Sequence, residues 1–320
     1  MKITELIKHT EEKSNTAFSF EVLPPIKGTG IDKLRKDIEK FIPFGPKYIN
    51  ITTHRCEPVL RKLENGLYER RMQRLRPGTV AVAAALQNEY GIPIVPHLLC
   101  SGFTKEETEY ILLDLMYLGI KNVLLLRGDK AREETMFRPT AGGYSHTTEL
   151  QKQVNDFNKG KFLDGTIFET EGKQFSYGVA CYPEKHDESP NLESDMKWFK
   201  YKVEHGADYG VTQMFFDNKK YFNFIDKAKA MGITVPVIPG IKPLAKLSQI
   251  NVLPKLFHCD LPIDLTKEIT KCKSDDDIKV LGIEWCVSQC KELIEHGVPS
   301  IHFYMTGNSD SLFQIAKRLF

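Results

Sequence analysis

Two acidic residues, Glu21 and Asp129, stand where apolar, strand-like runs of the sequence should be ending. Glu21 lies within the run 18–23 (FSFEVL), and Asp129 closes the run 123–129 (VLLLRGD). A carboxylate in or just after such a run must be desolvated, paired or used in chemistry, because burying a lone charge costs several kcal/mol or shifts its pKa. Helix capping or a loop ion pair would explain either residue alone. Two such residues in one chain favour a role in chemistry.

The composition argues against several classes of partner. Of the 320 residues, 41% are hydrophobic and 27% charged, and no apolar run reaches the roughly 20 residues of a membrane span. A net charge of +2, without basic runs interleaved with aromatics, gives no sign of nucleic-acid binding. The amphipathic, partly acidic start at residues 1–8 does not have the pattern of a signal peptide. We therefore expect a cytoplasmic protein with neither a membrane nor a nucleic-acid partner.

The cysteines predict neither disulfides nor a zinc site. They are odd in number, seven, and none forms a C-x-x-C pair. Most lie in apolar segments, which suits buried free thiols. The H-x-H and H-E-x-x-H spacings of metal sites are also missing, and we expect no bound metal.

Short β-rich runs alternate with longer amphipathic stretches along the chain. Strands are predicted over residues 17–23, 47–53, 92–99, 121–127, 175–181, 208–214, 234–239 and 299–305. Helices are predicted over 31–41, 105–118, 192–205, 219–231 and 278–296, several with a glycine just past the end, as at Gly119, Gly206, Gly232 and Gly297.

This order predicts an α/β fold, a (β/α)8 TIM barrel forming a single domain over residues 1–320. Apolar strands joined by helices imply a parallel sheet covered on both faces, and eight such repeats favour a closed barrel over an open sheet. The longest irregular pieces are residues 130–146, expected as a long loop after the fourth strand, and an insertion near 158–173.

In a barrel, the carboxyl ends of the strands and the loops that follow them face the active site. Polar residues gather at these positions, one group for nearly every strand: Glu21; Asn50, Thr52, Thr53 and His54; His97; Arg127, Gly128 and Asp129; Tyr182, Glu184, His186 and Glu188; Thr212, Gln213 and Asp217; Tyr304 and Asn308. Purely structural explanations stay open for individual residues of these groups. His97 also suits a hydrogen-bonded core histidine, and Gln213 could satisfy a neighbouring backbone group. The chain has neither G-x-G-x-x-G nor a P-loop motif.

Seven segments in order carry a resemblance to the methylenetetrahydrofolate reductases, running from about residue 18 to the end. They are FSFE with PP at 18–25, PHL at 96–98, LRGD at 126–129, YPEKH at 182–186, TQMFFD at 212–217, IPGI at 238–241 and HFY at 302–304. The resemblance implies a (β/α)8 flavoprotein that uses NADH or NADPH to reduce FAD and then reduces 5,10-methylenetetrahydrofolate to 5-methyltetrahydrofolate.

The resemblance also implies roles for residues of this chain. Glu21 matches the acid that protonates the departing nitrogen as the methylene bridge opens. Asp129 matches an acid that contacts the folate pterin near the flavin, Gln213 an amide that binds folate, and Leu247 an apolar residue near the nicotinamide site. The positions matching FAD contacts are Thr52, His97, Leu126, Arg127, Gly128, Asp129, Tyr144, Tyr182, His186, Asp195 and Lys202, with Arg127 and Lys202 as phosphate partners.

The chain departs from the family pattern at three places. Where many members have an Arg after the last strand that contacts the folate tail, residues 305–309 read MTGNS. Thr53 stands where a Tyr or Trp is common, and Tyr201 where a helix often carries Arg. We therefore expect tail recognition and some flavin contacts to differ.

Two other kinds of protein stay open on the sequence. One is another TIM-barrel flavoenzyme, of the proline dehydrogenase type, which would explain barrel and flavin without Glu21 and Gln213 in these contexts. The other is a non-catalytic pterin- or flavin-binding barrel, which two pocket-facing acids disfavour. A small-molecule folate substrate and a homo-oligomeric state are expected.

Overall fold

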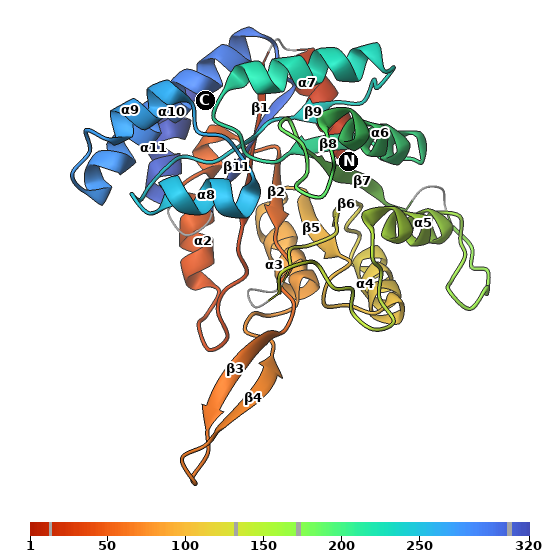
Figure 1. The fold of residues 1–320 in the computed structure, drawn as a ribbon. Coiled ribbons are helices and arrows are strands. Elements are labelled where there is room, and N and C mark those ends of the chain that lie inside the picture. Colours follow the sequence, from red (N-terminus) through yellow and green to blue (C-terminus); the bar gives the residue numbers. More distant parts are fainter. Residues whose placement is uncertain (13–14, 131–133, 171–173, 306–308) are drawn as a thin grey trace. The chain divides into compact units, whose positions relative to one another are not determined.

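The structure is a computed structural model that describes residues 1–12, 15–130, 134–170, 174–305 and 309–320 (Figure 1). The strands are β1 (Ala17–Val22), β2 (Tyr48–Ile51), β3 (Glu57–Lys62), β4 (Tyr68–Gln73), β5 (Ile94–Leu99), β6 (Asn122–Leu126), β7 (Ser176–Cys181), β8 (Tyr209–Thr212), β9 (Val237–Ile238), β10 (Gly240–Ile241) and β11 (Ser300–Tyr304). The helices are α1 (Ile3–Glu11), α2 (Asp32–Glu39), the 3₁₀ turn η1 (Ile42–Phe44), α3 (Thr79–Tyr90), α4 (Lys105–Tyr117), α5 (Thr147–Asn158), α6 (Leu192–Glu204), α7 (Asn218–Ala230), α8 (Gln249–Phe257), α9 (Ile263–Ile269), α10 (Asp275–Glu295) and α11 (Ser309–Leu319).

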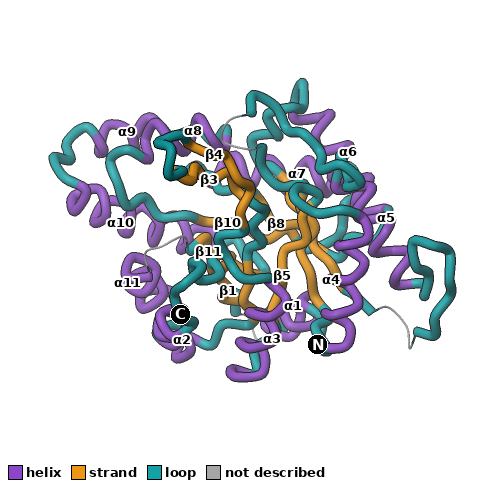
Figure 2. The backbone as a smooth tube through the Cα atoms, turned by 90° about the horizontal axis from the view of Figure 1, so that it is seen from below, coloured by secondary structure: helices purple, strands orange, loops and turns teal. Residues whose placement is uncertain are grey.

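Parallel strands alternate with helices, as Figure 2 shows by colour along the tube. β1 and β10 each pair in parallel with β11, β5 pairs with β6, and β8 pairs with both β7 and β9. These strands and β2 belong to one nine-stranded sheet. The predicted fold class, a (β/α)8 TIM barrel, is confirmed.

All eight predicted strand positions are occupied. Of the run expected at 234–239 only β9 is a strand, and the further short strand β10 follows just past its end, beyond Pro239. Proline has no backbone N–H to donate to the ladder, so the strand is interrupted there. Helix ends follow the expected chemistry: Thr104 and Glu107 form a capping box that starts α4, and Gly119 ends it with φ of 67°.

The chain forms two compact units. The first comprises residues 1–22, 37–50 and 176–320, and the second comprises 23–36 and 51–175. In the first, buried aromatic rings pack together, for example Phe18 with Phe20 and Phe303 at centroid distances of 5.6 and 5.8 Å. In the second, apolar residues of β5 and β6 such as Val95 and Leu125 are fully buried. The prediction of a single domain stays a prediction.

The sequence reasoning missed the hairpin β3–β4 and helices α3, α5, α8, α9 and α11. The hairpin carries a strong local signal, because Asn65-Gly66 joins two strand-like runs and Gly66 has φ of 83°. The expected loop at 130–146 contains no helix or strand within its described part, 134–146. The insertion near 158–173 is anchored to α5, as far as residue 170, by Phe168, whose ring centroid lies 5.0 Å from that of Phe157 and 4.3 Å from that of Phe162.

A prediction follows from the close packing of Gly240 in β10. A Cβ there would collide with the carbonyl oxygen of Thr212 and the hydroxyl of Tyr304, so Gly240→Ala should lower the free energy of unfolding by about 1–3 kcal/mol. Gly30→Ala is the matched control, because Gly30 is exposed, its φ is not in the left-handed region, and its Cβ would make only an ordinary contact with Asp32 at 3.9 Å. Urea unfolding measures both variants. A Gly240→Ala variant as stable as Gly30→Ala would contradict the packing described here.

Candidate active site

Glu21 is buried at the carboxyl end of β1. Its residue is 8% exposed, and in the parallel ladder it stands opposite Tyr304 of β11. The alternation along β1 leaves its neighbours Phe20 and Val22 fully buried in the core. A carboxyl group in these surroundings has few competing waters and can hold or release a proton at a defined place.

Tyr304 links the end of β11 to the end of β8. Its hydroxyl donates a hydrogen bond to the carbonyl oxygen of Thr212, and the Thr212 hydroxyl accepts one from the Gly240 amide at 2.9 Å. Burial raises the pKa of Tyr304 well above its usual range, and the nearby Glu21 carboxylate raises it further. Tyr304 is therefore a neutral hydrogen-bond donor beside Glu21.

Lys242 brings a cation to the same end of the first unit. Burial lowers the pKa of its ammonium group, while the attraction of Glu21 raises it and so acts in the opposite direction. The sequence reasoning did not single out Lys242. The feature that could have identified Lys242 is its position, a charged residue directly after the short apolar strand β10.

The predicted folate residues Gln213 and Leu247 both belong to the first unit. Gln213 follows β8, its backbone amide donates to the Cys181 carbonyl at 2.8 Å, and its side-chain oxygen accepts from the Met214 amide at 2.9 Å. Leu247 is 42% exposed in the loop before α8, where its amide donates to Asp275. The structure thus brings Gln213, Tyr304 and Glu21 to the same ends of parallel strands.

Four residues predicted to contact FAD lie in the loop after β7 and in α6: Tyr182 and His186 in the loop, Asp195 and Lys202 in the helix. The Tyr182 and His186 rings meet edge to face at 4.8 Å, and Asp195 in the first turn of α6 accepts from the Ser189 hydroxyl at 2.9 Å. Lys202 donates from Nζ to the Ala180 carbonyl at 2.8 Å. Burial lowers the pKa of Lys202, and the attraction of Asp195 opposes that shift.

Glu184 ties this loop to the segment after α8. One carboxyl oxygen accepts from the Asp260 amide at 3.0 Å, and the other is buried without a hydrogen-bond partner among the described residues. Burial raises the pKa of Glu184 to about 7, and the Asp260 carboxylate adds to the shift while its amide opposes it. Close by, Asp187 lies 3.0 Å from His186 and 3.5 Å from His258.

In the second unit, hydroxyl groups and histidines meet at the end of β5. The Thr53 hydroxyl donates to the His97 carbonyl and lies 2.6 Å from the Thr79 hydroxyl, while the Thr52 hydroxyl lies 3.0 Å from Nε2 of His54. Burial, with a smaller contribution from His54, lowers the pKa of His97 to about 3, so its imidazole is neutral. Thr53, one of the departures from the family pattern, thus has a structural role.

The loop after β6 holds Leu126, Arg127, Gly128 and Asp129. The Arg127 guanidinium lies over the Phe137 ring at 4.5 Å. Gly128 has φ of 85°, and a Cβ there would collide with the Ser101 side chain. Asp129 is exposed. Of the outcomes expected for this carboxylate, desolvation is therefore excluded, because the chain leaves the sheet at Gly128, while pairing and a role in chemistry stay predictions.

Tyr144 is buried beside α4, where Lys105 lies over its ring at 5.3 Å. Burial raises its pKa to about 12. The departure at Tyr201 falls on α6, where its ring stacks on His205 with a centroid distance of 3.8 Å. Of the altered segment 305–309, residues 306–308, Asn308 among them, lie outside the described residues.

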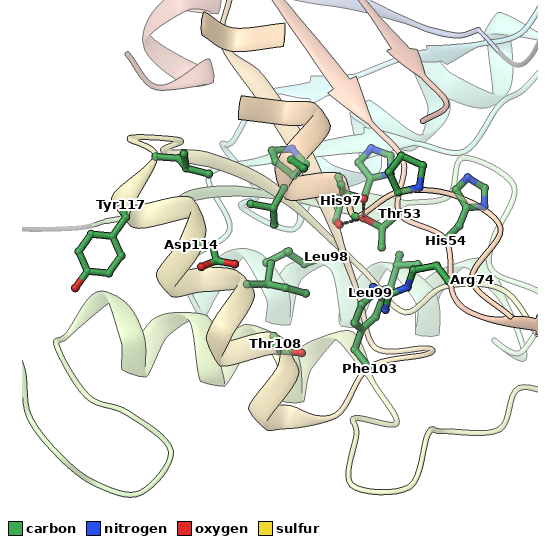
Figure 3. Close-up of a pocket in the computed structure, with 18 residues that line it drawn as sticks. Thr53, His54, Arg74, His97, Leu98, Leu99, Phe103, Thr108, Asp114 and Tyr117 are labelled. Carbon is green, nitrogen blue, oxygen red and sulfur yellow. Dashed lines mark hydrogen bonds between the residues drawn. The ribbon is translucent and has the colours of Figure 1, made fainter. Parts of the chain in front are cut away.

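A groove of about 530 Å³ runs between α3 and α4 in the second unit (Figure 3). Its inner end is lined by Thr53, His54 and His97, and its outer part by apolar residues of the two helices. Arg74 reaches this groove and lies over Phe103 at 5.8 Å. The sequence reasoning missed Arg74, which follows the unpredicted strand β4.

The comparisons place the chain in a family. The family model described as Methylenetetrahydrofolate reductase matches residues 6–320, and the chain belongs to that family. It is 27% identical to "Methylenetetrahydrofolate reductase (NADH) 1" of Arabidopsis thaliana over the whole chain but only 51% of that protein. It is 26% identical to "5,10-methylenetetrahydrofolate reductase" of Escherichia coli, covering 94% of the chain and 90% of the relative.

The chain therefore spans about half the length of the eukaryotic relatives it matches and most of the bacterial one. Among solved structures, one is titled "Uncharacterized protein from Clostridium thermocellum binds two copies of 5-methyl-5,6,7,8-tetrahydrofolic acid". It covers 98% of both chains with a TM-score of 0.58 and 13% identity, a likeness that concerns the fold.

Two features are absent from the described residues. None of their helices combines the length and the apolar character needed to cross a membrane. They contain no group of three or more His, Cys, Asp or Glu residues suited to a metal ion. The seven cysteines, all in the described part of the chain, are free, and five are buried, as predicted.

A prediction follows from the raised pKa of Glu184. Between its usual pKa of 4.5 and the folded value of about 7, the Glu184 carboxyl is protonated to a greater extent in the folded protein than in the unfolded chain. The contribution of Glu184 to stability should therefore fall by about 1–2 kcal/mol, after allowing for solvent screening, as pH rises from 4.5 through 7.

Buried, neutral His97 shifts the profile in the opposite direction up to pH 6.5, so the test is the difference in stability between wild type and variant. Glu184→Gln should lose stability relative to wild type at pH 5 and less or none at pH 8, whereas Glu188→Gln, in the exposed part of the same loop, should differ from wild type equally at both. Urea unfolding at pH 5 and pH 8 gives the comparison, and a difference between wild type and Glu184→Gln that is the same at both pH values would contradict the assignment.

Proposed function

We propose that this protein reduces 5,10-methylenetetrahydrofolate to 5-methyltetrahydrofolate with NADH or NADPH, using FAD as its cofactor. The observation that carries the proposal is Glu21, a carboxyl group buried at a strand end in a chain that belongs to the methylenetetrahydrofolate reductase family. The names of the bacterial relatives, which the chain matches over most of their length, support the same reaction.

We assign the proton of the reaction to Glu21. Opening of the methylene bridge leaves negative charge on a nitrogen, and a nearby acid must supply a proton so that the carbon can accept hydride. The buried carboxyl of Glu21 can hold that proton away from bulk water. Glu21 raises the pKa values of Tyr304 and Lys242 in the same unit, and the hydroxyl of Tyr304 fixes the strand ends around Glu21 through its hydrogen bond to Thr212.

The residues predicted to contact FAD form one group in each unit. The donor groups of both suit the cofactor, which when bound would carry hydride from the nicotinamide to the folate. In the second unit, the neutral imidazole of His97 and the hydroxyl of Thr52 can pair with ring edges, and Arg127 can pair with phosphate. Gly128, in the left-handed conformation, has no side chain and so lets a ligand approach the backbone closely. In the first unit, Tyr182 and His186 offer ring faces and edges, and Asp195 and Lys202 offer charged partners.

We assign folate binding to Asp129 and Gln213, and the nicotinamide contact to Leu247. An exposed carboxylate such as Asp129 can stabilise positive charge that develops on the substrate. The side-chain amide of Gln213 can pair with the amide-like edge of a pterin. We further propose a homo-oligomer in the cytoplasm.

The test is the absorption spectrum of the purified protein under anaerobic conditions. A flavin spectrum should bleach on addition of NADH or NADPH and return on addition of 5,10-methylenetetrahydrofolate. Recovery with another acceptor and not with the folate would favour a flavoenzyme of the proline dehydrogenase type. Bound flavin that neither nicotinamide reduces would favour a non-catalytic barrel.

Glu21→Gln should separate the two half-reactions. Reduction of the flavin by nicotinamide needs no proton from Glu21 and should stay within a few fold of wild type. Reduction of the folate should slow by about 10²–10⁴-fold, the usual effect of losing a general acid. Stopped-flow absorbance measures both rates, with Glu295→Gln, an exposed residue at the end of α10, as the control. Equal losses in the two half-reactions would show that Glu21 is structural.

Asp129→Asn should raise the flavin reduction potential, because removing a negative charge favours the electron-rich reduced form. A rise of about 20–30 mV corresponds to about 1–1.4 kcal/mol for two electrons, a modest effect that suits an exposed carboxylate. Folate should also bind less tightly. Spectroelectrochemistry and folate titration measure the two effects, and if neither changed, Asp129 would lie outside the site.

A further inference from the structure

The hairpin β3–β4, residues 57–73, extends away from the rest of the second unit as an arm (Figure 1). Its strands pair antiparallel with each other and form a two-stranded sheet of their own. A two-stranded hairpin is only marginally stable in water unless something packs on one of its faces. We therefore expect another surface to pack against one face of the arm.

One face of the arm is apolar and basic. Because side chains alternate along a strand, the pairs Pro58–Met72, Leu60–Arg70 and Lys62–Tyr68 lie on the same side. Leu60 is 67%, Tyr68 63% and Met72 60% exposed, and Leu67 at the tip is 64% exposed. So many large apolar side chains on one small element mark an interaction surface.

The same unit carries a receptor of matching chemistry, the groove of about 530 Å³ between α3 and α4. Its outer part is lined by Pro77, Val80 and Ala81 on the α3 side and by Ile111, Tyr117 and Leu118 on the α4 side. Tyr117 and Leu118 are 83% and 45% exposed. The small side chains of α3, an alanine-rich helix, leave the space that a protruding side chain could fill.

We propose that the arm of one copy of this chain packs into the α3–α4 groove of a second copy, and that the second copy does the same in return. Two features favour a second copy as the occupant. The chain itself carries both an apolar protrusion and an apolar groove, and reciprocal exchange about a two-fold axis closes the assembly as a dimer. Charges also match in the outer part of the groove, because the arm face carries Lys62 and Arg70 while the charged residue there is Asp114; Arg74, also in the lining, lies near His54 at the inner end (Figure 3).

The inner end of the groove, at Thr53 and His97, is not part of this interface. The arm occupies the outer stretch along α4, which Figure 3 marks by Asp114 and Tyr117. The inference deepens the proposed homo-oligomer and does not depend on the proposed reaction. Its experiment measures association alone, so its failure would leave the folate chemistry untouched.

The test is sedimentation velocity over a range of protein concentrations. Two variants damage opposite sides of the interface at exposed positions: Leu60→Ser with Tyr68→Ser in the arm, and Ala81→Arg in the groove. Each should raise the Kd of the dimer by at least about tenfold, as loss of central apolar contacts does. Circular dichroism checks that the variants are folded.

Two controls change neighbouring positions outside the interface. Tyr110→Glu alters an exposed residue of α4 that does not line the groove, and Arg61→Ala alters the opposite face of the arm. Both should keep the Kd within about threefold of wild type, because neither removes an apolar contact at the centre of the interface.

Mixing the arm variant with the groove variant gives the sharpest result. A mixed dimer keeps one undamaged arm–groove contact, so the mixture should associate more tightly than either variant alone. A wild-type protein that stays monomeric would overturn the proposal and assign the arm to a different protein. A dimer that the arm variant weakens and Ala81→Arg does not would also overturn it, since the arms would then pair with each other.

Discussion

The burial of one carboxylate, that of Glu21, is the constraint on which the end of the first unit depends. Removing a carboxylate from water is costly. The groups whose pKa values respond to Glu21 are the neutral hydroxyl of Tyr304 and the ammonium of Lys242. Tyr304 can reach Thr212 only because residue 240 has no side chain. Packing and chemistry are thus joined in the same few residues.

Burial also shifts the pKa values of Glu184 and His97, and these shifts decide whether each side chain changes its charge near neutral pH. Glu184 joins the loop after β7 to the segment after α8 through the Asp260 amide, at a pKa near neutrality. His97, in contrast, is neutral at any physiological pH because burial depresses its pKa to about 3. Glu184 can therefore respond to pH, whereas His97 is a constant, neutral hydrogen-bonding partner.

The sequence predicted the repeats well because period and glycine position are local signals. The end of α4 at Gly119 is an example, and so is β6, an apolar run. It could not predict that Asp129 is exposed, since exposure depends on where the chain turns at Gly128. Lys242 and Arg74 were missed because each follows a short or unexpected strand. The arm was missed although Asn65-Gly66 signalled it, because its strands pack on no predicted core.

The central claim is that this chain by itself carries out folate reduction. The most direct measurement is mass spectrometry of the product formed by the purified protein from 5,10-methylenetetrahydrofolate, FAD and NADH or NADPH without oxygen. The account predicts 5-methyltetrahydrofolate in an amount equal to the nicotinamide oxidised. Oxidation of nicotinamide without that product, or no turnover by a folded, FAD-loaded protein, would contradict it.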